Sequence, residues 1–271
     1  MRAAIVFLVL TVMGLAFFLY VAPFHLASFA VWAGVVAVLL GVICVIKPLR
    51  FAGIPTRLMG SAVLIGGVVV MGSGLLWPAA SVRIARPATY LDEVMPQYDF
   101  SEYHVERVHA APERVVAAWR QVTFHDLKVA VTLMHIRALA FGKLPRRSRA
   151  ASPPILKLLP ASGFTIVHDD GRELVFVMAG QPWSGRRGTR LSGLEDFAAF
   201  QQSDSVRIAA NLRVEDEGGG WSRVITETRT QATDSTARRH MAAYWRIIYP
   251  GTGMIRRMWL RAICERAASG Q

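Results

Sequence analysis

The first 78 residues contain no aspartate or glutamate, although the whole chain of 271 residues has 19 acidic and 31 basic residues. Basic residues are also scarce there, and only Arg2, Lys47, Arg50 and Arg57 occur. Because charged side chains normally cover the surface of a soluble domain, this scarcity excludes an ordinary solvated surface for these residues. All acidic residues and most basic ones follow residue 78, where the chain has a net positive charge.

Cysteine is almost absent, and the two cysteines, Cys44 and Cys264, lie far apart in the sequence. Neither has the spacing of a metal site, so we expect two free thiols, no disulfide framework and no bound metal. The sequence also lacks a phosphate-binding glycine-rich loop and the G-x-S-x-G motif of serine hydrolases. We therefore expect no cofactor.

Three long apolar blocks fill the first 78 residues, at residues 3–21, 26–46 and 58–77. A helix needs about 20 apolar residues, with a rise of about 1.5 Å each, to cross a hydrocarbon core of about 30 Å. We predict three transmembrane helices that form an anchor over residues 1–78. No block contains a charged residue, which argues against an ion or proton pathway through the anchor.

The basic residues beside these blocks predict their orientation. If the N-terminus is cytoplasmic, all four basic residues of the anchor lie on the cytoplasmic side, and only Arg83 and Arg86 follow on the other side. The positive-inside rule favours this arrangement. Three crossings then place the C-terminal domain of this integral, multi-pass protein on the extracytoplasmic side.

Small residues form a ridge on the second block, where Ala33, Ala37 and Gly41 are spaced four residues apart. Such ridges allow membrane helices to approach closely. The ridge is interpreted either as a homo-oligomer contact between copies of the chain or as packing among the three spans. We favour packing among the spans.

Residues 79–97 are predicted to be a linker, and residues 98–271 a domain of mixed α and β structure. A strand is expected over residues 102–109. A helix then begins at Pro112, because proline suits the first position of a helix. A second helix is expected over residues 126–141, and the basic sequence KLPRRSR follows it.

The second half of this domain predicts a hairpin and C-terminal helices. Apolar and polar residues alternate over residues 205–214, and a glycine turn separates them from a second strand over residues 221–230. Asp234 is expected to cap the next helix. The Pro-Gly-Thr-Gly sequence at residues 250–253 is expected to interrupt that helix before a last one begins.

Three segments carry a resemblance to a known family. They are YHVERVHAAPERVVAAW, DSVRIAANLRVEDEGGGWSRVITETRTQATD and the closing amphipathic helix. They resemble the first strand and helix, the late β-meander and the last helix of the START-like helix-grip superfamily. This superfamily, also called SRPBCC, includes polyketide cyclases and lipid-transfer proteins. The resemblance covers about residues 98–268, and the tail ETR…ATD…YW…PG.G.IRR.WL.AI is most similar to poorly characterised bacterial, membrane-anchored members.

The resemblance implies an α+β fold, in which a curved antiparallel sheet wraps around a long C-terminal helix and encloses an apolar cavity. The implied function is binding or transfer of a hydrophobic, lipid-like molecule by a domain tethered to the membrane. The expected wall residues are Trp119, Trp245, Trp259, Ile255 and Ile263.

Membrane lipid is the second expected partner. Basic side chains of the last helices are interpreted either as contacts to lipid head groups or as an ordinary polar helix face; they are Arg238, Arg239, Arg256 and Arg257. Nucleic acid is not expected, because the basic residues are scattered rather than gathered in a reading motif.

An enzyme is the alternative that we favour less, with a cyclase-like or aromatase-like activity on a hydrophobic substrate. Glu227 is a candidate general base if its strand face lines a cavity, but on an exposed face it pairs with a nearby arginine, which we favour. His125 is a candidate beside Asp126, although Asp126 is better explained as a helix cap. A third alternative is an interaction module that binds no ligand.

Overall fold

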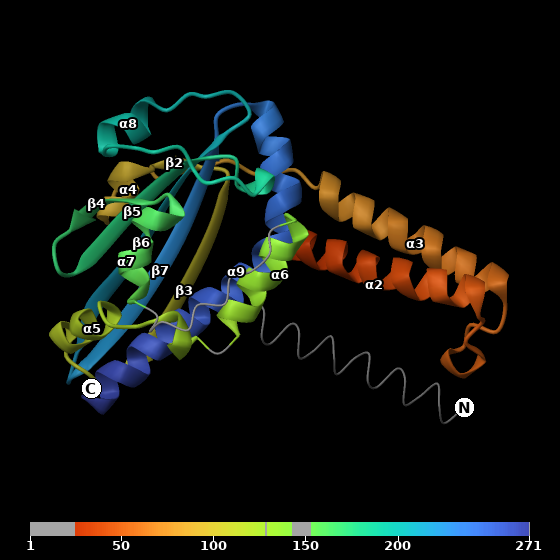
Figure 1. The fold of residues 1–271 in the computed structure, drawn as a ribbon, viewed down its shortest axis with the longest axis horizontal. Coiled ribbons are helices and arrows are strands. Elements are labelled where there is room, and N and C mark those ends of the chain that lie inside the picture. The colour runs from red at the N-terminus through yellow and green to blue at the C-terminus, as the bar shows by residue number, and fades with distance from the viewer. Residues whose placement is uncertain (1–24, 128, 143–152, 271) are drawn as a thin grey trace. The chain divides into compact units, whose positions relative to one another are not determined.

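The structure, a computed structural model, describes residues 25–127, 129–142 and 153–270 (Figure 1). It contains two compact units. The anchor unit contains the helices that precede Pro78 together with Ala242–Met254. The sheet unit contains Ala79–Met241 and the residues from Ile255 onward.

The anchor unit contains α2 (Leu26–Ile46) and α3 (Arg57–Leu76), and the short turn η1 (Arg50–Ala52) lies between them in the sequence. Both helices are long and apolar enough to cross a membrane. The first predicted span, residues 3–21, lies outside the described residues. The structure therefore supports two of the three predicted spans.

Glycines bring α2 and α3 into close contact. A Cβ atom added at Gly41 would lie 2.5 Å from the backbone nitrogen of Leu64, and one at Gly67 would lie 2.9 Å from the Cβ atom of Ala37. Only glycine fits at such distances, as in small-residue packing between membrane helices. Two residues of the predicted ridge, Ala37 and Gly41, are thus used within one chain.

The C-terminal helix α9 (Ser235–Ser269) is continuous over 35 residues. As predicted, the Asp234 side chain caps it by accepting a hydrogen bond from the backbone N–H of Ala237. The predicted interruption at residues 250–253 is wrong, because the helix runs through Pro250.

Packing of α9 within the anchor unit explains why Pro250 does not end the helix. Proline removes a single backbone donor and strains one turn, a cost of about 3 kcal/mol. Contacts of the preceding turn oppose that cost: the Trp32 indole donates to the Ile247 carbonyl at 3.2 Å, and Arg246 donates to the Leu75 carbonyl at 2.6 Å. The second bond also satisfies an end carbonyl of α3, which lacks a partner within its own helix.

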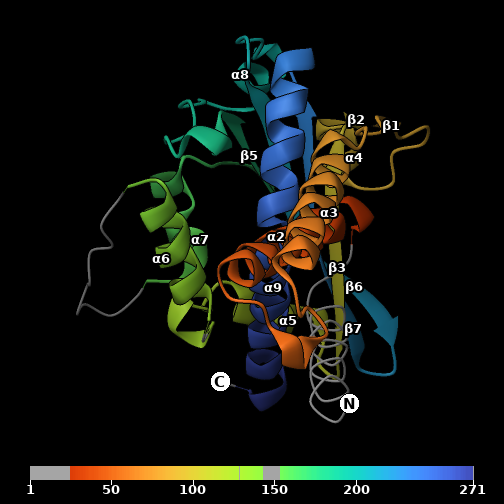
Figure 2. The same ribbon diagram turned by 90° about the vertical axis from the view of Figure 1, so that its right-hand side faces the viewer.

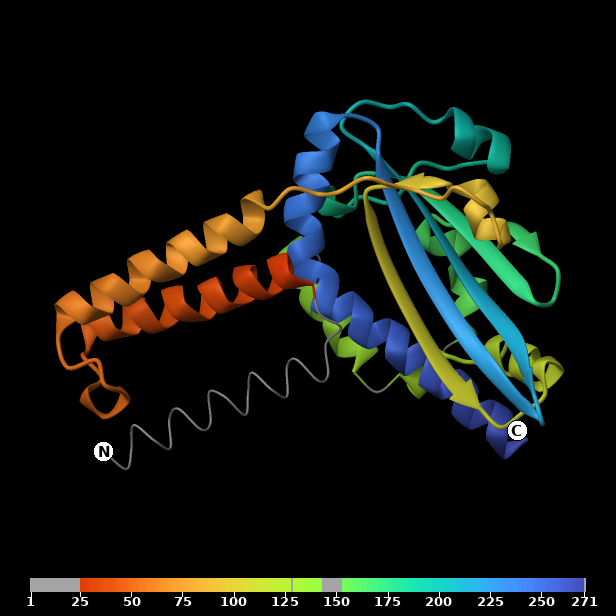
Figure 3. The same ribbon diagram turned by 180° about the vertical axis from the view of Figure 1, so that it is seen from behind.

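A five-stranded antiparallel sheet dominates the sheet unit, which confirms the predicted α+β class with an antiparallel sheet and a C-terminal helix (Figures 1 and 3). In spatial order the strands are β3 (Phe100–Val108), β7 (Trp221–Ala232), β6 (Val206–Gly218), β5 (Glu173–Gly180) and β4 (Thr165–Asp169). The predicted hairpin is β6 and β7, which are longer than the alternating residues alone indicated.

The two faces of the sheet bury different elements. Even-numbered residues of β3, β5, β6 and β7 share one face, termed the α9 face, on which Leu212 and Phe176 pack with Trp259 and Leu260 of α9 and with α5 (Pro112–Trp119). Odd-numbered residues form the opposite face. That face carries a smaller core, which includes Val175, Leu91 and Phe197.

The residues predicted as a linker, 79–97, contain local structure that covers the opposite face. They form β1 (Val82–Arg83), α4 (Tyr90–Val94) and β2 (Gln97–Tyr98), and β1 pairs with β2. A capping box begins α4, in which Thr89 and Asp92 exchange hydrogen bonds between side chain and backbone. This reciprocal bonding stabilises even a short helix. On the same face lies α8 (Leu194–Ala199).

The helix expected over residues 126–141 begins later, as α6 (Ala130–Ala140). Asp126 caps the preceding turn η2 (Phe124–Asp126) instead, because its Oδ2 accepts from the backbone N–H of Thr123 at 2.7 Å. Figure 2 shows α6 to one side of the sheet. The remaining short elements are α7 (Ile155–Leu158), η3 (Pro160–Ser162) and η4 (Pro182–Ser184).

Candidate functional site

Two ionisable side chains meet on the α9 face of strand β3. Glu102 and His104 are two residues apart, so the pleat of the strand directs both to the same side. A Glu102 Oε1 atom lies 2.8 Å from His104 Nε2. The residues are only 4% and 6% exposed, although acidic side chains are almost never buried without a partner.

Arg256 of α9 approaches the same face from the helix side. Its Nη2 donates to Thr228 Oγ1 at 2.8 Å, and its Nη1 donates to Thr226 Oγ1 at 3.3 Å. The guanidinium also lies over the rings of Trp259 and Phe176, at 5.7 and 6.0 Å from their centroids. The helix thus directs a positive charge into the interface with the sheet.

Burial lowers the pKa of Arg256, and the nearby Glu102 carboxylate partly offsets this effect. A guanidinium nevertheless stays charged in a protein. Glu102, His104, Thr226, Thr228 and Arg256 are together termed the α9-face cluster. It combines a carboxylate, a guanidinium, an imidazole and two hydroxyls within an otherwise apolar layer.

Some buried polar atoms near this cluster have no hydrogen-bond partner within the described part of the chain. They are Thr230 Oγ1 and the indole nitrogens of Trp119 and Trp259, all on the α9 face. A buried donor or acceptor without a partner costs about 1–3 kcal/mol. Such groups are rare in folded proteins, and a bound molecule is one way to satisfy them.

An apolar row lies beside the cluster on the same face. Phe100, Thr230 and Ile208 occupy neighbouring positions on β3, β7 and β6, and Met178 of β5 continues the row. Phe100 and Ile208 are buried but belong to neither of the two core clusters. The row provides apolar surface directly beside polar groups.

The opposite face carries a different ionic arrangement, here termed the Arg229 network. Arg229 Nε lies 2.6 Å from Glu227 Oε1, and its Nη2 lies 2.6 Å from Asp92 Oδ1. Its Nη1 donates to the Met95 carbonyl at 3.2 Å, and its guanidinium lies 4.8 Å from the centroid of the Tyr98 ring. Two carboxylates, a carbonyl and a ring therefore surround this buried arginine.

The contact with Arg229 also affects the pKa of Asp92. Burial opposes ionisation of the carboxyl group, but hydrogen bonds from the Ala88 backbone and from Arg229 outweigh burial and lower the pKa. The network joins α4 to the sheet through fixed charges. It is a structural feature that holds residues 79–97 on the opposite face.

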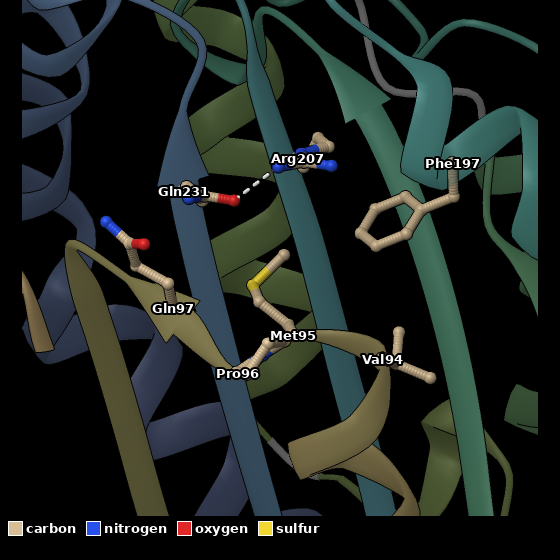
Figure 4. A pocket seen from close by; sticks show the side chains of 7 residues that line it. All are labelled: Val94, Met95, Pro96, Gln97, Phe197, Arg207 and Gln231. Carbon is tan, nitrogen blue, oxygen red and sulfur yellow. Dashed lines mark hydrogen bonds between the residues drawn. The ribbon is translucent and has the colours of Figure 1, made fainter. Parts of the chain in front are cut away.

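A cavity of about 270 Å³ also lies on the opposite face (Figure 4). Its lining residues are Val94, Met95, Pro96, Gln97, Phe197, Arg207 and Gln231. Arg207 donates to Gln231 Oε1 at 2.5 Å and to the Ala198 carbonyl at 2.9 Å. Its guanidinium therefore joins β6 to β7 and to α8 beside the cavity. The predicted cavity was expected between the sheet and the last helix, whereas this one lies on the other side of the sheet.

Four of the five predicted wall residues belong to the sheet unit, and one belongs to the anchor unit. Trp119, Trp259 and Ile263 are buried in the core of the α9 face, and Ile255 packs against the edge of that core. Trp245 belongs to the anchor unit, where its ring lies 5.7 Å from that of Tyr249.

The two candidate catalytic residues lie apart. Glu227 is on the opposite face and pairs with Arg229, which is buried. His125 is exposed in η2, beside the capping residue Asp126. Neither residue contributes to the α9-face cluster.

The four predicted head-group arginines also have different surroundings. Arg238 pairs with Asp99, and Arg239 is exposed and donates to Thr236. Arg257 is half-buried. Arg256 lies in the α9-face cluster, so its guanidinium is directed to the sheet rather than to a membrane surface.

Sequence reasoning missed the pairing of Glu102 with His104. The available signal was the spacing of two on a strand, which directs both side chains to one face. Arg256 was interpreted either as a lipid head-group contact or as part of a polar helix face, because helical periodicity does not show which arginine faces the sheet. No group of three or more residues that could hold a metal occurs in the described ranges.

Comparisons with known proteins add little. No family model matches the chain, and no curated protein matches it. Among solved structures, the crystal structure of a hypothetical protein from Helicobacter pylori aligns with 8% sequence identity and a TM-score of 0.28. The alignment covers 62% of this chain and 86% of that one. A similarity this low carries no inference about fold or function.

Proposed function

We propose that the chain is a membrane-anchored protein that binds a hydrophobic molecule with a polar end, on the α9 face of its sheet. The polar end binds at the α9-face cluster, and the apolar part lies along the row formed by Phe100, Ile208 and Met178. The helices α2 and α3 hold the binding domain close to the bilayer, which supplies the ligand. The START-like resemblance supports the same function.

The observation that carries this proposal is the α9-face cluster itself. Arg256 is half-buried between α9 and the sheet, and it donates hydrogen bonds to two neutral threonine hydroxyls. A partly desolvated cation of this kind favours a ligand that brings an acceptor, such as a carboxylate or phosphate, because charge-assisted hydrogen bonds are the stronger ones.

The apolar part of the ligand would provide most of the binding energy. Removal of apolar surface from water contributes about 25 cal/mol per Å². The polar groups would then fix the orientation of the ligand, as the few polar groups of a typical small-molecule site do.

The proposal is tested by extraction of the full-length protein from a mild detergent into organic solvent, followed by mass spectrometry. We expect one class of amphiphile to be enriched over bulk lipid. Arg256→Met should lower its recovery about tenfold, the effect of losing one charge-assisted hydrogen bond of about 1.4 kcal/mol.

The matched control is Arg239→Met, which makes the same change at an exposed position of the same helix and should leave recovery unchanged. An empty wild-type protein in several detergents contradicts the proposal. That result favours the interaction module that binds no ligand.

A second candidate function is acid–base catalysis by Glu102 and His104. The contact of 2.8 Å between Glu102 Oε1 and His104 Nε2 favours it, because a carboxylate can orient an imidazole that transfers a proton. If the protein is an enzyme, His104→Asn should retain a molecule whose mass differs from that retained by the wild type. The same molecule in both proteins indicates binding alone.

We also propose that the sheet unit lies on the extracytoplasmic side, as the basic residues flanking the apolar blocks predict. Gln201 is exposed after α8 and suits a cysteine label. An impermeant thiol reagent should modify Gln201→Cys in intact cells. Modification only after lysis places the domain in the cytoplasm.

A further inference from the structure

Helix α6 is apolar, yet the described protein leaves most of it uncovered. Ile136 and Leu139 are 58% and 56% exposed, and Val131 and Met134 are also exposed. Within α6, Ala130 is the one residue that is fully buried. Isolated exposed apolar residues are common, but several on one short helix mark a surface that contacts something else.

The ends of α6 are attached to the sheet unit, while its middle is not covered. At the C-terminal end, the Phe141 ring packs so closely on Gly185 that a Cβ atom there would lie 2.5 Å from the ring. Arg137 donates to the Pro182 carbonyl at 3.5 Å. These contacts fix the helix and leave its apolar side chains directed outward.

We propose that α6 lies in the head-group region of the bilayer that the anchor helices enter. With 11 residues it is too short to cross a hydrocarbon core, which requires about 20. A short apolar helix attached at its ends suits the interface instead, where its side chains insert a few ångströms below the head groups.

Two observations favour a lipid surface over a protein partner. The described part of the chain contains two helices long and apolar enough to cross a membrane, so a bilayer would be the surface that is always near. The charge in and directly after α6 is positive: Arg137 is its one charged residue, and the following sequence KLPRRSR has no acidic residue. Basic residues beside an inserted apolar helix attract anionic lipids.

This inference rests on the anchor and is independent of what the α9-face cluster binds. Its test uses the full chain, with Cys44 and Cys264 replaced by alanine and one copy in each lipid nanodisc. An environment-sensitive fluorophore is attached at Ile136→Cys or, in a second variant, at Leu139→Cys. The matched control carries it at Gln201→Cys, an exposed polar position outside α6.

Lipids brominated in their acyl chains quench only fluorophores that enter the hydrocarbon boundary. We expect them to reduce the fluorescence at Ile136→Cys and Leu139→Cys by about half or more, and to leave Gln201→Cys unchanged. Arg137→Gln should weaken this quenching in anionic lipids and have little effect in neutral ones.

Two results overturn the proposal. Fluorophores at α6 that stay in water and unquenched show that the helix does not touch the bilayer. Fluorophores that are shielded from water but unquenched by brominated lipid show that protein covers α6. Because each nanodisc holds one copy, quenching cannot come from a second chain that brings α6 to its own anchor.

Discussion

The two faces of the sheet surround an arginine in different ways. On the opposite face, Arg229 contacts two carboxylates and a carbonyl oxygen. On the α9 face, Arg256 contacts two threonine hydroxyls, and the hydroxyl of Thr230 nearby finds no partner in the described residues. The first arginine therefore bonds to charged acceptors, whereas the second donates to neutral hydroxyls, with the Glu102 carboxylate nearby.

This difference distinguishes the Arg229 network, a structural feature, from the α9-face cluster, the proposed binding site. A saturated ion network holds elements together, and its loss leaves buried charges unpaired. A buried polar cluster with remaining hydrogen-bonding capacity costs stability in the empty protein and gains by binding a ligand. Among the described residues, Arg213 Nε on the opposite face also has no hydrogen-bond partner, although its Nη1 pairs with Glu215.

The largest expected effect compares Arg229→Met with Arg256→Met. Arg229→Met leaves Asp92 and Glu227 buried without their cation, and should reduce the free energy of unfolding by about 3–5 kcal/mol. Arg256→Met removes a partly desolvated charge that donates to two hydroxyls, and should change the free energy of unfolding by about 1 kcal/mol or less. Urea denaturation of the full chain in detergent measures both. Equal losses of unfolding free energy in the two variants would contradict the distinction between the two faces.

A smaller effect is expected for Asp92→Asn, which removes one carboxylate but leaves Glu227 on Arg229. We expect a loss of about 2 kcal/mol at neutral pH. Because the folded protein holds the pKa of Asp92 below its usual value of 3.8, the carboxylate stabilises the fold above that value. This contribution disappears as the pH falls through the folded-state pKa.

The measurement is the unfolding free energy of wild type and Asp92→Asn between pH 7 and pH 3. The difference should be constant down to about pH 4 and shrink below it. A difference that grows on acidification would show that Asp92 is protonated in the folded protein.

Two threonines of β7 on the α9 face allow a hydroxyl with hydrogen-bond partners to be compared with one without. Thr226 donates to the Asn211 carbonyl at 2.7 Å and accepts from Arg256, so Thr226→Val should cost about 1 kcal/mol of unfolding free energy. Thr230→Val removes a buried hydroxyl without a partner and should stabilise the empty protein by up to about 1 kcal/mol. Equal destabilisation by both would show that Thr230 has a partner.

The smallest effect concerns Cys264, which packs against the core of the α9 face. Burial, with the nearby Glu106 and Glu265 carboxylates, raises its pKa to about 12. Only the thiolate reacts with alkylating reagents, so Cys264 should stay unmodified at pH 8 and react after denaturation. Rapid alkylation of the folded protein would mean that α9 separates from the sheet.

Local patterns predicted much of the sheet unit. Alternation along β6 and β7, proline at the start of α5 and Asp234 before α9 each act through neighbouring residues, so the sequence shows them directly. Pro250 misled the prediction, because contacts of Trp32 and Arg246 from distant parts of the chain keep α9 continuous.

The candidate site was harder to predict, because it depends on strand pairing and helix rotation. Glu102 and Thr228 are partners across β3 and β7, although 126 positions separate them in the sequence. Only the register brings them together, and only the rotation of α9 distinguishes Arg256 from Arg257. The helical pattern also gave no sign that Trp245 and Trp259, which share a helix, lie in different units.

The most direct test of the α9 face as the binding face is photo-cross-linking with a diazirine-bearing amphiphile, mapped to single residues by mass spectrometry. We predict adducts on even-numbered residues of β3, β6 and β7, such as Phe100 and Ile208, and their loss in Arg256→Met. Adducts confined to the cavity lined by Phe197 and Gln231 would contradict this account.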